Sequence, residues 1–372
     1  MSETHTIRAK FFNVLGNFTL DVDFAAPAKG VTALFGPSGC GKTTVIRCIA
    51  GLIRVTDGFC DIDGDIWQKP DRTFLPTHKR PLGYVFQEAN LFPHLSVRKN
   101  LLFGAPKEKP KDRPEIDFDE VVDLLGVRHL LDRAPRNLSG GERQRIGIGR
   151  ALLTQPKVLL MDEPLSALDR RTKSEILPFI EKLRDHFAVP IFYITHDMTE
   201  VERLADQIVL LDKGHLVASG PLADLQSDPS SPLSSSREAA VTLHGVVESF
   251  DDKFGLLNLT IPGGRLIAPA PPAYVGEPRR IRILASDVSL ARENPGRSSI
   301  LNVFRAKVVS MKALDPYEIV AVVALGEQGE GARLLSRMTR KSWEELGFTE
   351  GQTVFAQVKY VALGAGRGEP EE

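Results

Sequence analysis

One octapeptide constrains the fold of this chain more than any other feature. Residues Gly36–Thr43 read GPSGCGKT and match the pattern G-x-x-x-x-G-K-[ST] in full. The apolar run Val31–Phe35 predicts a strand before this loop, and Lys42–Ala50 predicts a helix after it. Glycines let the backbone wrap a phosphate without Cβ clashes, and the start of the helix adds partial positive charge. The sequence therefore predicts a strand–loop–helix unit that holds the phosphates of a nucleotide.

The last two side chains of this phosphate loop carry specific chemistry. Lys42 can reach the β- and γ-phosphates, and the Thr43 hydroxyl can coordinate Mg²⁺. Successive backbone N–H groups can point inward at the phosphates. The residues expected to bind ATP here are Gly36, Pro37, Ser38, Gly39, Cys40, Gly41, Lys42, Thr43 and Thr44.

The first part of the chain has the pattern of a parallel α/β sheet. Short apolar runs without polar alternation end abruptly at glycine or at a polar residue, which is typical of strands covered on both faces. These runs are Val31–Phe35, Tyr84–Phe86, Val158–Met161 and Ile191–Thr195, and the residues that follow them are Gly36, Gln87, Asp162 and His196. Because ligands bind just outside the carboxyl ends of parallel strands, we expect these positions to converge on one site.

Two adjacent acids end the run Val158–Met161. Asp162 can hold Mg²⁺ through water. Glu163 points to the other side of the strand end, where it can polarise an attacking water. Many strands end at a solvated acid, but a preceding phosphate loop favours a catalytic role for this pair.

The segment Leu138–Glu142 reads LSGGE and precedes a helical pattern that ends at Leu153. Ser139 and Glu142 fit the capping box S-x-x-E and predict the start of a helix. A capping box does not explain the two glycines between them, which weaken a helix. A closely approaching anion would justify them.

The run LSGGERQR, placed between the phosphate loop and the Asp-Glu strand, resembles the signature motif of the ATP-binding cassette (ABC) family. The resemblance implies a homodimer in which Ser139, Gly140 and Gly141 of one subunit close over the γ-phosphate bound to the other. It also implies ATP and Mg²⁺ as cofactors, and separate membrane permease subunits as partners.

Further positions match family landmarks in the expected order. Gln87 matches the glutamine that binds Mg²⁺ and senses the transport partner. Asp169 ends the segment Ser166–Asp169, which matches the D-loop. His196 matches the switch histidine, which contacts the γ-phosphate and orders Glu163. The resemblance thus implies Glu163 and His196 as catalytic residues and Thr43, Gln87 and Asp162 as the Mg²⁺ ligands.

The family normally stacks an aromatic residue near the N-terminus on adenine. Here the expected position carries Leu15, with Phe11, Phe12 and Phe18 nearby. The sequence does not decide between adenine stacking and core packing for these phenylalanines.

Composition divides the chain into zones. Residues 1–225 form the predicted ABC ATPase domain, an α/β fold with a helical insert at about 88–137. Residues 226–240 read QSDPSSPLSSSREAA, which is typical of a linker. Short alternating runs separated by Gly and Pro in 241–363 predict a small all-β barrel. These runs are Val246–Ser249, Leu256–Ile261, Arg280–Leu284, Arg305–Val309, Ile319–Leu325 and Val354–Val361. The tail, 364–372, is predicted to be disordered.

Parts of the last zone resemble the Mop/TOBE domain, an OB-like barrel, of molybdate importer ATPases. They are Arg282–Leu290, Ser298–Val309 and Met338–Gly347. Ser and Asn side chains with backbone N–H groups can surround a tetrahedral dianion such as molybdate, and lysines can offset its charge. The candidate oxyanion residues are Ser299, Asn302, Lys307, Lys341 and Ser342, for which the alternative role is to satisfy turns of the barrel.

The function implied by these resemblances is ATP hydrolysis that drives molybdate uptake at the cytoplasmic face of the membrane. A periplasmic or extracellular molybdate-binding protein is an indirect partner. The alternatives are another cargo, such as tungstate, sulfate, iron or sugar, or an oxyanion-sensing binding protein gated by nucleotide.

Charge, hydropathy and cysteine usage argue against three other classes of protein: nucleic-acid-binding, membrane-spanning and disulfide-rich proteins. The formal net charge is -1, so the electrostatic case for nucleic-acid binding is absent. The longest nearly unbroken apolar run, Ile319–Leu325, is far shorter than the ~20 residues of a membrane helix. Cys40, Cys48 and Cys60 form no C-x-x-C pair, and an odd count argues against a disulfide framework. We expect buried thiols in a reducing compartment.

Overall fold

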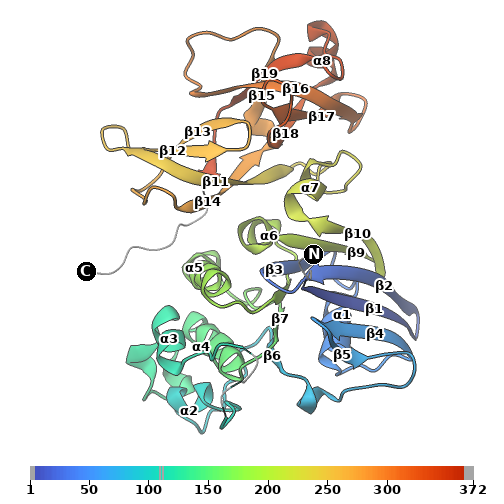
Figure 1. Cartoon of the computed structure of the whole chain (residues 1–372), viewed down its shortest axis with the longest axis vertical. Coiled ribbons are helices and arrows are strands. Elements are labelled where there is room, and N and C mark those ends of the chain that lie inside the picture. Colours follow the sequence, from blue (N-terminus) through green and yellow to red (C-terminus); the bar gives the residue numbers. More distant parts are fainter. Residues whose placement is uncertain (1–4, 109, 111–112, 364–372) are drawn as a thin grey trace. The chain divides into compact units, whose positions relative to one another are not determined.

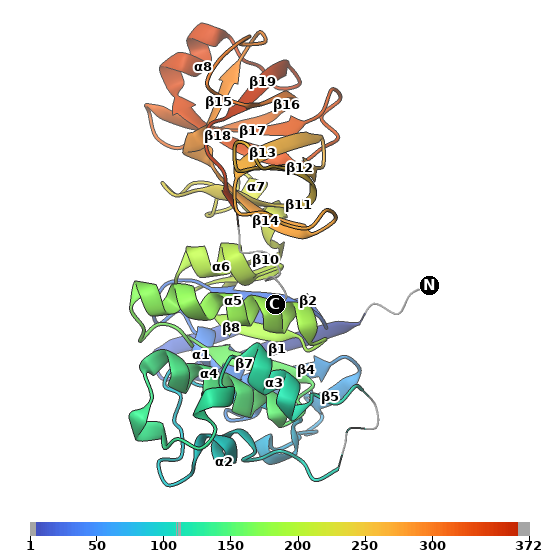
Figure 2. The same cartoon turned by 90° about the vertical axis from the view of Figure 1, so that its left-hand side faces the viewer.

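The structure is a computed structural model that describes residues 5–108, 110 and 113–363. Its contacts divide the chain into an N-terminal unit, Met1–Gly220, and a C-terminal unit, Pro221–Glu372 (Figures 1 and 2). The predicted disordered tail, 364–372, lies outside the described residues. No helix in the described ranges is long and apolar enough to cross a membrane.

A ten-stranded sheet in the order β5-β4-β1-β2-β10-β9-β3-β8-β7-β6 forms the centre of the N-terminal unit. Its strands are β1 (Thr6–Leu15), β2 (Phe18–Pro27), β3 (Val31–Phe35), β4 (Asp57–Ile62), β5 (Asp65–Gln68), β6 (Leu82–Val85), β7 (Val158–Asp162), β8 (Ile191–Ile194), β9 (Gln207–Asp212) and β10 (His215–Pro221). The first four strands of the order meet through antiparallel pairs. The β9-β3-β8-β7-β6 half is parallel throughout.

The parallel half contains the strands that the apolar runs predict, and they are neighbours. β3, β8, β7 and β6 lie side by side, so their carboxyl ends share one edge of the sheet. In β3, β7 and β8, the residues are buried along nearly the whole strand, as expected for strands covered on both faces. The predicted α/β fold class is confirmed.

Helices of the N-terminal unit fill the connections between these strands. They are α1 (Lys42–Ala50), α2 (Val97–Leu101), α3 (Phe118–Leu124), α4 (Gly140–Leu153), α5 (Arg170–His186) and α6 (Met198–Leu204), with 3₁₀ turns η1 (Thr77–Lys79), η2 (Arg128–Leu130) and η3 (Pro135–Asn137). Helices α2 and α3, from the segment predicted as a helical insert, pack against α4, and the three lie together in both views (Figures 1 and 2).

All cysteines of the chain are buried and free, as predicted. Burial raises the pKa of the Cys48 and Cys60 thiols to about 12. Both thiols are therefore protonated at neutral pH, and they serve as small apolar side chains of the core.

The C-terminal unit contains two five-stranded antiparallel sheets around one hydrophobic core. The first, in the order β13-β12-β11-β14-β20, consists of β11 (Ala240–Asp251), β12 (Leu256–Ile261), β13 (Gly264–Pro269), β14 (Pro278–Leu284) and β20 (Ala362–Leu363). The second, in the order β15-β19-β16-β17-β18, consists of β15 (Val288–Ala291), β16 (Asn302–Ala313), β17 (Glu318–Leu325), β18 (Arg333–Thr339) and β19 (Thr353–Val358). Helices α7 (Leu222–Ser227) and α8 (Arg340–Leu346) and the 3₁₀ turn η4 (Ala285–Asp287) complete the unit.

The second sheet curls into half a barrel. Its edge strands β15 and β18 contact each other, and Ser336 Oγ donates to Val288 O at 2.7 Å. The apolar run Ile319–Leu325 lies in β17, whose side chains are buried on both faces. This run therefore builds the core, in which each large aliphatic side chain contributes about 1.5–3 kcal/mol.

The Ser-rich segment 226–240 has more internal structure than its composition suggests. Helix α7 overlaps its start and packs against β11 and β18. Gln226, Ser231 and Ser234 are buried. Gln226 Oε1 accepts the Thr242 N–H at 2.8 Å, and Ser234 Oγ donates to Ser231 O at 2.9 Å. Polar side chains of this segment thus form hydrogen bonds within a turn and with the first strand of the C-terminal unit.

Candidate functional site

The phosphate loop follows β3 and leads into α1. Gly39 and Gly41 adopt φ angles of 80° and 104°, which favour glycine. A Cβ on Gly36 would lie 2.1 Å from Leu211 O, so this position admits glycine only. Helix α1 begins at Lys42 without a side-chain cap, and its first N–H groups therefore remain for a bound anion.

Lys42 points into the loop that precedes it. Its Nζ donates to Gly36 O at 2.8 Å and to Pro37 O at 3.0 Å, and the residue is 4% exposed. Carbonyl groups of the loop thus hold the ammonium group beside the backbone that is expected to wrap the phosphates. A buried cation held by neutral acceptors is suited to a polyanionic ligand.

Thr43 and Asp162 meet at the strand ends. Thr43 Oγ1 donates to Asp162 Oδ1 at 2.9 Å, and Tyr84 OH donates to Asp162 Oδ2 at 3.1 Å. Burial, with the Asp162 charge as a smaller cause, raises the pKa of the Tyr84 hydroxyl well above its ordinary value, so it stays a donor. The sequence interpretation missed Tyr84, although a hydroxyl within the short run LGYV of β6 was a usable signal.

The oxygen donors at this point are those that Mg²⁺ prefers. Within the described ranges, no group of three or more His, Cys, Asp or Glu side chains can hold a metal alone. Gln87, the remaining predicted ligand, is exposed directly after β6 and Phe86.

Glu163 and His196 also come together. His196 Nδ1 lies 3.5 Å from Glu163 Oε2, and the side chains are 52% and 23% exposed, respectively. Glu163 has a φ of 45°, in the left-handed region that non-glycine residues rarely adopt. Its N–H donates to Ile194 O at 3.2 Å, which holds this conformation against the end of β8. Such strain is typical of functional positions.

The predicted D-loop continues from Glu163. Ser166 donates to Glu163 O through its N–H at 3.2 Å and its Oγ at 2.9 Å. Asp169 caps α5, since its carboxylate accepts from Thr172 N at 3.0 Å and from Thr172 Oγ1 at 2.8 Å. These hydrogen bonds, that of the Thr172 N–H first, lower the pKa of Asp169.

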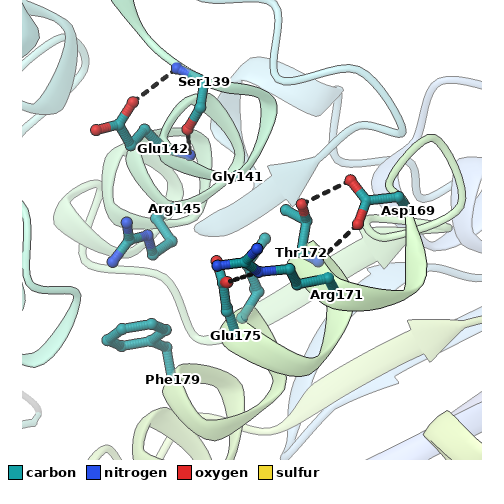
Figure 3. A pocket seen from close by; sticks show the side chains of 10 residues that line it. Ser139, Gly141, Glu142, Arg145, Asp169, Arg171, Thr172, Glu175 and Phe179 are labelled. Atoms are coloured by element: carbon teal, nitrogen blue, oxygen red, sulfur yellow. Dashed lines mark hydrogen bonds and ion pairs between the residues drawn. The ribbon is translucent and has the colours of Figure 1, made fainter.

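The capping box predicted at the signature segment is present. Ser139 Oγ accepts from Glu142 N at 3.2 Å, and Glu142 Oε2 accepts from Ser139 N at 2.6 Å (Figure 3). The bond from the Ser139 N–H is the main cause that lowers the pKa of Glu142. A Cβ on Gly141 would lie 2.8 Å from Thr172 Cγ2. Packing within the chain thus explains Gly141 without an anion.

A cavity of about 670 Å³ separates the starts of α4 and α5 (Figure 3). Ser139, Gly141 and Glu142 line it from α4, and Asp169, Thr172 and Glu175 line it from α5. Arg145 lies over the Phe179 ring, 4.7 Å from its centroid. The signature segment and the D-loop helix therefore share one surface of the N-terminal unit.

Helix α4 also holds the backbone around Gln87. Gln144 Nε2 donates to Phe86 O at 3.4 Å, and Arg150 donates to Ala89 O at 3.0 Å and to Asn90 O at 3.1 Å. The segment that carries Gln87 is thus attached to the helix that begins at the signature segment.

The aromatic residues near the N-terminus have separate environments. Phe11 is fully buried in the core. Phe12 is 46% exposed. Phe18 lies against the phosphate loop, because a Cβ on Gly41 would approach Phe18 Cζ to 2.8 Å. The Leu15 side chain lies outside the described part of the chain.

The candidate oxyanion residues of the C-terminal unit engage neighbouring groups instead of forming one cluster. Asn302 Oδ1 accepts from Ile267 N at 2.7 Å and its Nδ2 donates to Ile267 O at 2.9 Å, which joins β16 to β13. The remaining contacts are Lys307 Nζ to Gln328 Oε1 at 3.0 Å, Lys341 Nζ to Glu345 Oε1 at 3.5 Å, and Ser342 Oγ to Thr339 Oγ1 at 2.8 Å, while Ser299 is exposed.

A glycine-rich loop after a parallel strand, an adjacent hydroxyl–carboxylate pair and a neighbouring carboxylate–imidazole pair define a P-loop nucleotide-binding unit. The comparisons with known proteins agree with this class. A family model described as "ABC transporter" matches residues 19–166, and one described as "TOBE domain" matches residues 298–363.

Relatives match nearly the whole chain. The molybdenum import ATP-binding protein ModC of Rhodopseudomonas palustris (strain HaA2) is 58% identical over 98% of this chain and 96% of its own length. The protein of the same name from Rhodobacter capsulatus is 49% identical over 96% of this chain and 98% of its own. The solved structure of cbiO1 from Clostridium perfringens, part of the ABC transporter complex cbiONQ, has a TM-score of 0.51 and 26% identity, and the match covers 59% of this chain and 89% of that one. The chain belongs to the ATP-binding proteins of the ABC transporter family.

Proposed function

We infer that the chain is the ATP-hydrolysing subunit of an importer that takes up molybdate through a separate membrane permease. The observation that carries the cargo is the extent of the match, since relatives named for molybdenum import align with 98% of the chain. The match includes the C-terminal unit and is not limited to the phosphate site. The hydrolytic role is supported by the four strand ends that meet at one edge of the sheet.

The phosphate loop would bind the nucleotide. Backbone N–H groups of the loop and of the start of α1 would face the phosphates, and Lys42 would exchange the carbonyl groups of Gly36 and Pro37 for phosphate oxygens. Thr43 and Asp162, with Gln87 from the end of β6, would hold Mg²⁺. When bound, that ion would neutralise charge on the phosphate oxygens.

Glu163 would act as the general base. Its carboxylate is close to the surface and 3.5 Å from His196, so a water between it and the γ-phosphate can give up a proton to a Glu163 oxygen. His196 orients that carboxylate and can donate to the phosphoryl oxygens.

Dimerisation would complete each site. Ser139, Gly140 and Gly141 lie at the start of α4, beside the D-loop residue Asp169. A second copy facing this surface would receive their N–H groups on its γ-phosphate. The predicted assembly is a homodimer docked on permease subunits at the cytoplasmic face of the membrane, with an extracytoplasmic molybdate-binding protein as indirect partner.

The test is transport by the reconstituted complex. The chain is combined with its permease in proteoliposomes, and ATP hydrolysis and uptake of labelled molybdate, tungstate and sulfate are followed with and without Mg²⁺. We expect Mg²⁺-dependent hydrolysis coupled to molybdate uptake. Uptake of sulfate alone would identify another cargo, and oxyanion binding without turnover would favour a sensor.

Oxyanion binding by the C-terminal unit is a separate proposal. Calorimetry of the full chain with molybdate, tungstate and sulfate tests it directly. Binding of the first two but not sulfate would support a feedback role, and Lys307→Met or Lys341→Met would weaken it. The absence of binding to the folded chain would assign this unit a structural role.

A further inference from the structure

A buried charge cluster lies beside the proposed catalytic pair. The Glu200 side chain is 4% exposed, and its carboxylate has partners on both oxygens. Lys173 Nζ donates to Oε1 at 2.9 Å, and Tyr193 OH donates to Oε2 at 2.9 Å. Lys173 Nζ also lies 3.6 Å from Asp197 Oδ2. A carboxylate at this depth requires such partners to remain charged.

The elements that meet at Lys173 are those that carry catalytic groups. Lys173 lies on α5, which begins directly after Asp169 of the D-loop. Asp197 and Glu200 belong to the start of α6. His196 lies in the short turn between β8 and α6. Lys173 therefore ties the D-loop helix to the turn that presents His196.

Local hydrogen bonds give this turn its shape. Asp197 N donates to Thr195 Oγ1 at 3.0 Å, and Asp197 Oδ1 accepts from Thr199 N at 2.9 Å. These bonds connect residues of the turn to each other. The Lys173 ammonium is different because it joins the turn to a second helix.

A series of contacts begins and ends at Glu163. Its carbonyl group accepts two hydrogen bonds from Ser166 of the D-loop. The D-loop leads into α5, and Lys173 connects α5 to the start of α6. His196 completes this series of contacts, because its Nδ1 lies at a distance of 3.5 Å from Glu163 Oε2. A displacement of α5 against α6 would change this last distance.

We propose that Lys173 is a positioning residue for hydrolysis, which holds the His196 turn against the D-loop helix so that His196 stays within reach of Glu163. The proposal rests on the roles inferred above for Glu163 and His196. In this role Lys173 acts through its contacts with Glu200 and Asp197 and not through contact with the nucleotide. Movement of the D-loop when two subunits close would be transmitted to His196 through α5, Lys173 and the start of α6.

The test compares the kinetics of Lys173→Met, Lys173→Arg and wild type. In Lys173→Met we expect kcat for ATP hydrolysis to fall about ten- to a hundred-fold, because small misplacements of catalytic groups have effects of this size. KM and nucleotide affinity stay unchanged, since the phosphate loop is untouched. Lys173→Arg keeps the cation and restores most of kcat. Lys182→Met, an exposed lysine on the same helix, is the matched control and leaves both constants unchanged.

A double variant separates positioning from stability. Lys173→Met leaves Glu200 without its cation and lowers Tm, whereas Lys173→Met with Glu200→Gln removes the uncompensated charge and keeps an acceptor for Tyr193. We expect the double variant to recover Tm while kcat stays low. Recovery of kcat together with Tm would overturn the proposal.

Glu163→Gln, measured in parallel, separates this proposal from the function itself. If Glu163→Gln is inactive and Lys173→Met turns over like wild type, the positioning role alone is wrong. Full turnover in Glu163→Gln would overturn the catalytic assignment, and the positioning role with it.

Discussion

The two units of the molecule use polar side chains in opposite ways. In the N-terminal unit they gather where parallel strands end, and several are strained or open to solvent, such as Glu163 and His196. In the C-terminal unit, Asn302, Lys307, Lys341 and Ser342, four of the residues expected to bind an oxyanion, contact neighbouring protein groups, as Asn302 does with Ile267. Strand ends leave side chains available for a ligand, whereas polar groups between antiparallel sheets replace missing backbone hydrogen bonds. The first arrangement is suited to binding a ligand, and the second, at Asn302, joins β16 to β13.

Glu163→Gln gives the largest expected effect and tests the proposed hydrolytic role of the residues at the strand ends of the N-terminal unit. The amide cannot accept the proton of the attacking water, so kcat should fall by about 10²–10⁴. Nucleotide binding and Tm should remain close to wild type. Phosphate release and equilibrium nucleotide binding measure the two quantities. ATP hydrolysis by Glu163→Gln near the wild-type rate would contradict the proposed role of Glu163 as general base.

Asn302→Leu tests the structural side. The substitution leaves the partly buried N–H and C=O of Ile267 without the Asn302 side chain as a partner, and we expect a loss of about 1–3 kcal/mol in the free energy of unfolding. Denaturant titration measures the loss. Exposed Ser299→Ala, the control from the same segment, should change stability by less than about 0.5 kcal/mol. A tolerated Asn302→Leu that abolished molybdate binding would instead assign Asn302 to a ligand site.

A glycine–alanine comparison at residue 163 measures the strain of the catalytic position. Because the φ of 45° suits glycine, Glu163→Gly should be more stable than Glu163→Ala by about 1 kcal/mol. At Ser299 of the C-terminal unit, where the backbone has no positive φ, glycine should give no such advantage. Equal stabilities of the two residue-163 variants would argue against strain in the catalytic segment.

The smallest expected effect is the pH dependence of the helix caps. Hydrogen bonds with Ser139, that from its backbone N–H first, lower the pKa of Glu142 below its ordinary value. The stabilising contribution of the carboxylate is therefore present at neutral pH and is lost as pH falls through the lowered pKa. Wild type should exceed Glu142→Gln in stability by at most about 1 kcal/mol at neutral pH, and the difference should vanish in acid. Helix α8, capped by Thr339 with no acid in its first turn, provides no such titration. Unfolding between pH 3 and 7 measures both variants.

The sequence alone determined the phosphate loop and the parallel strands β3, β6, β7 and β8 of the N-terminal unit, but it did not predict β1, β2, β4, β5, β9 or β10. The octapeptide defined β3, the loop and α1 at the observed residues, and the capping box defined the start of α4. These features are local, because glycine conformations, caps and apolar runs depend on residues close in sequence. In the C-terminal unit the alternating runs located at least part of β11, β12, β14, β16, β17 and β19, but β13, β15, β18, β20 and α8 were missed. Their short, mixed patterns gain meaning only from the strands beside them.

Tertiary structure alone decided the contacts between distant segments. The pairing of Thr43 with Asp162, and of Glu163 with His196, depends on the order in which parallel strands lie in the sheet. The sequence could name these residues but not join Tyr84 to Asp162 or Lys173 to the turn of His196. It also could not foresee that Asn302 would bind Ile267. The sequence gives the chemistry of each side chain. Which strands fold beside a polar group decides whether that group is available to a ligand or bonds to a neighbouring backbone.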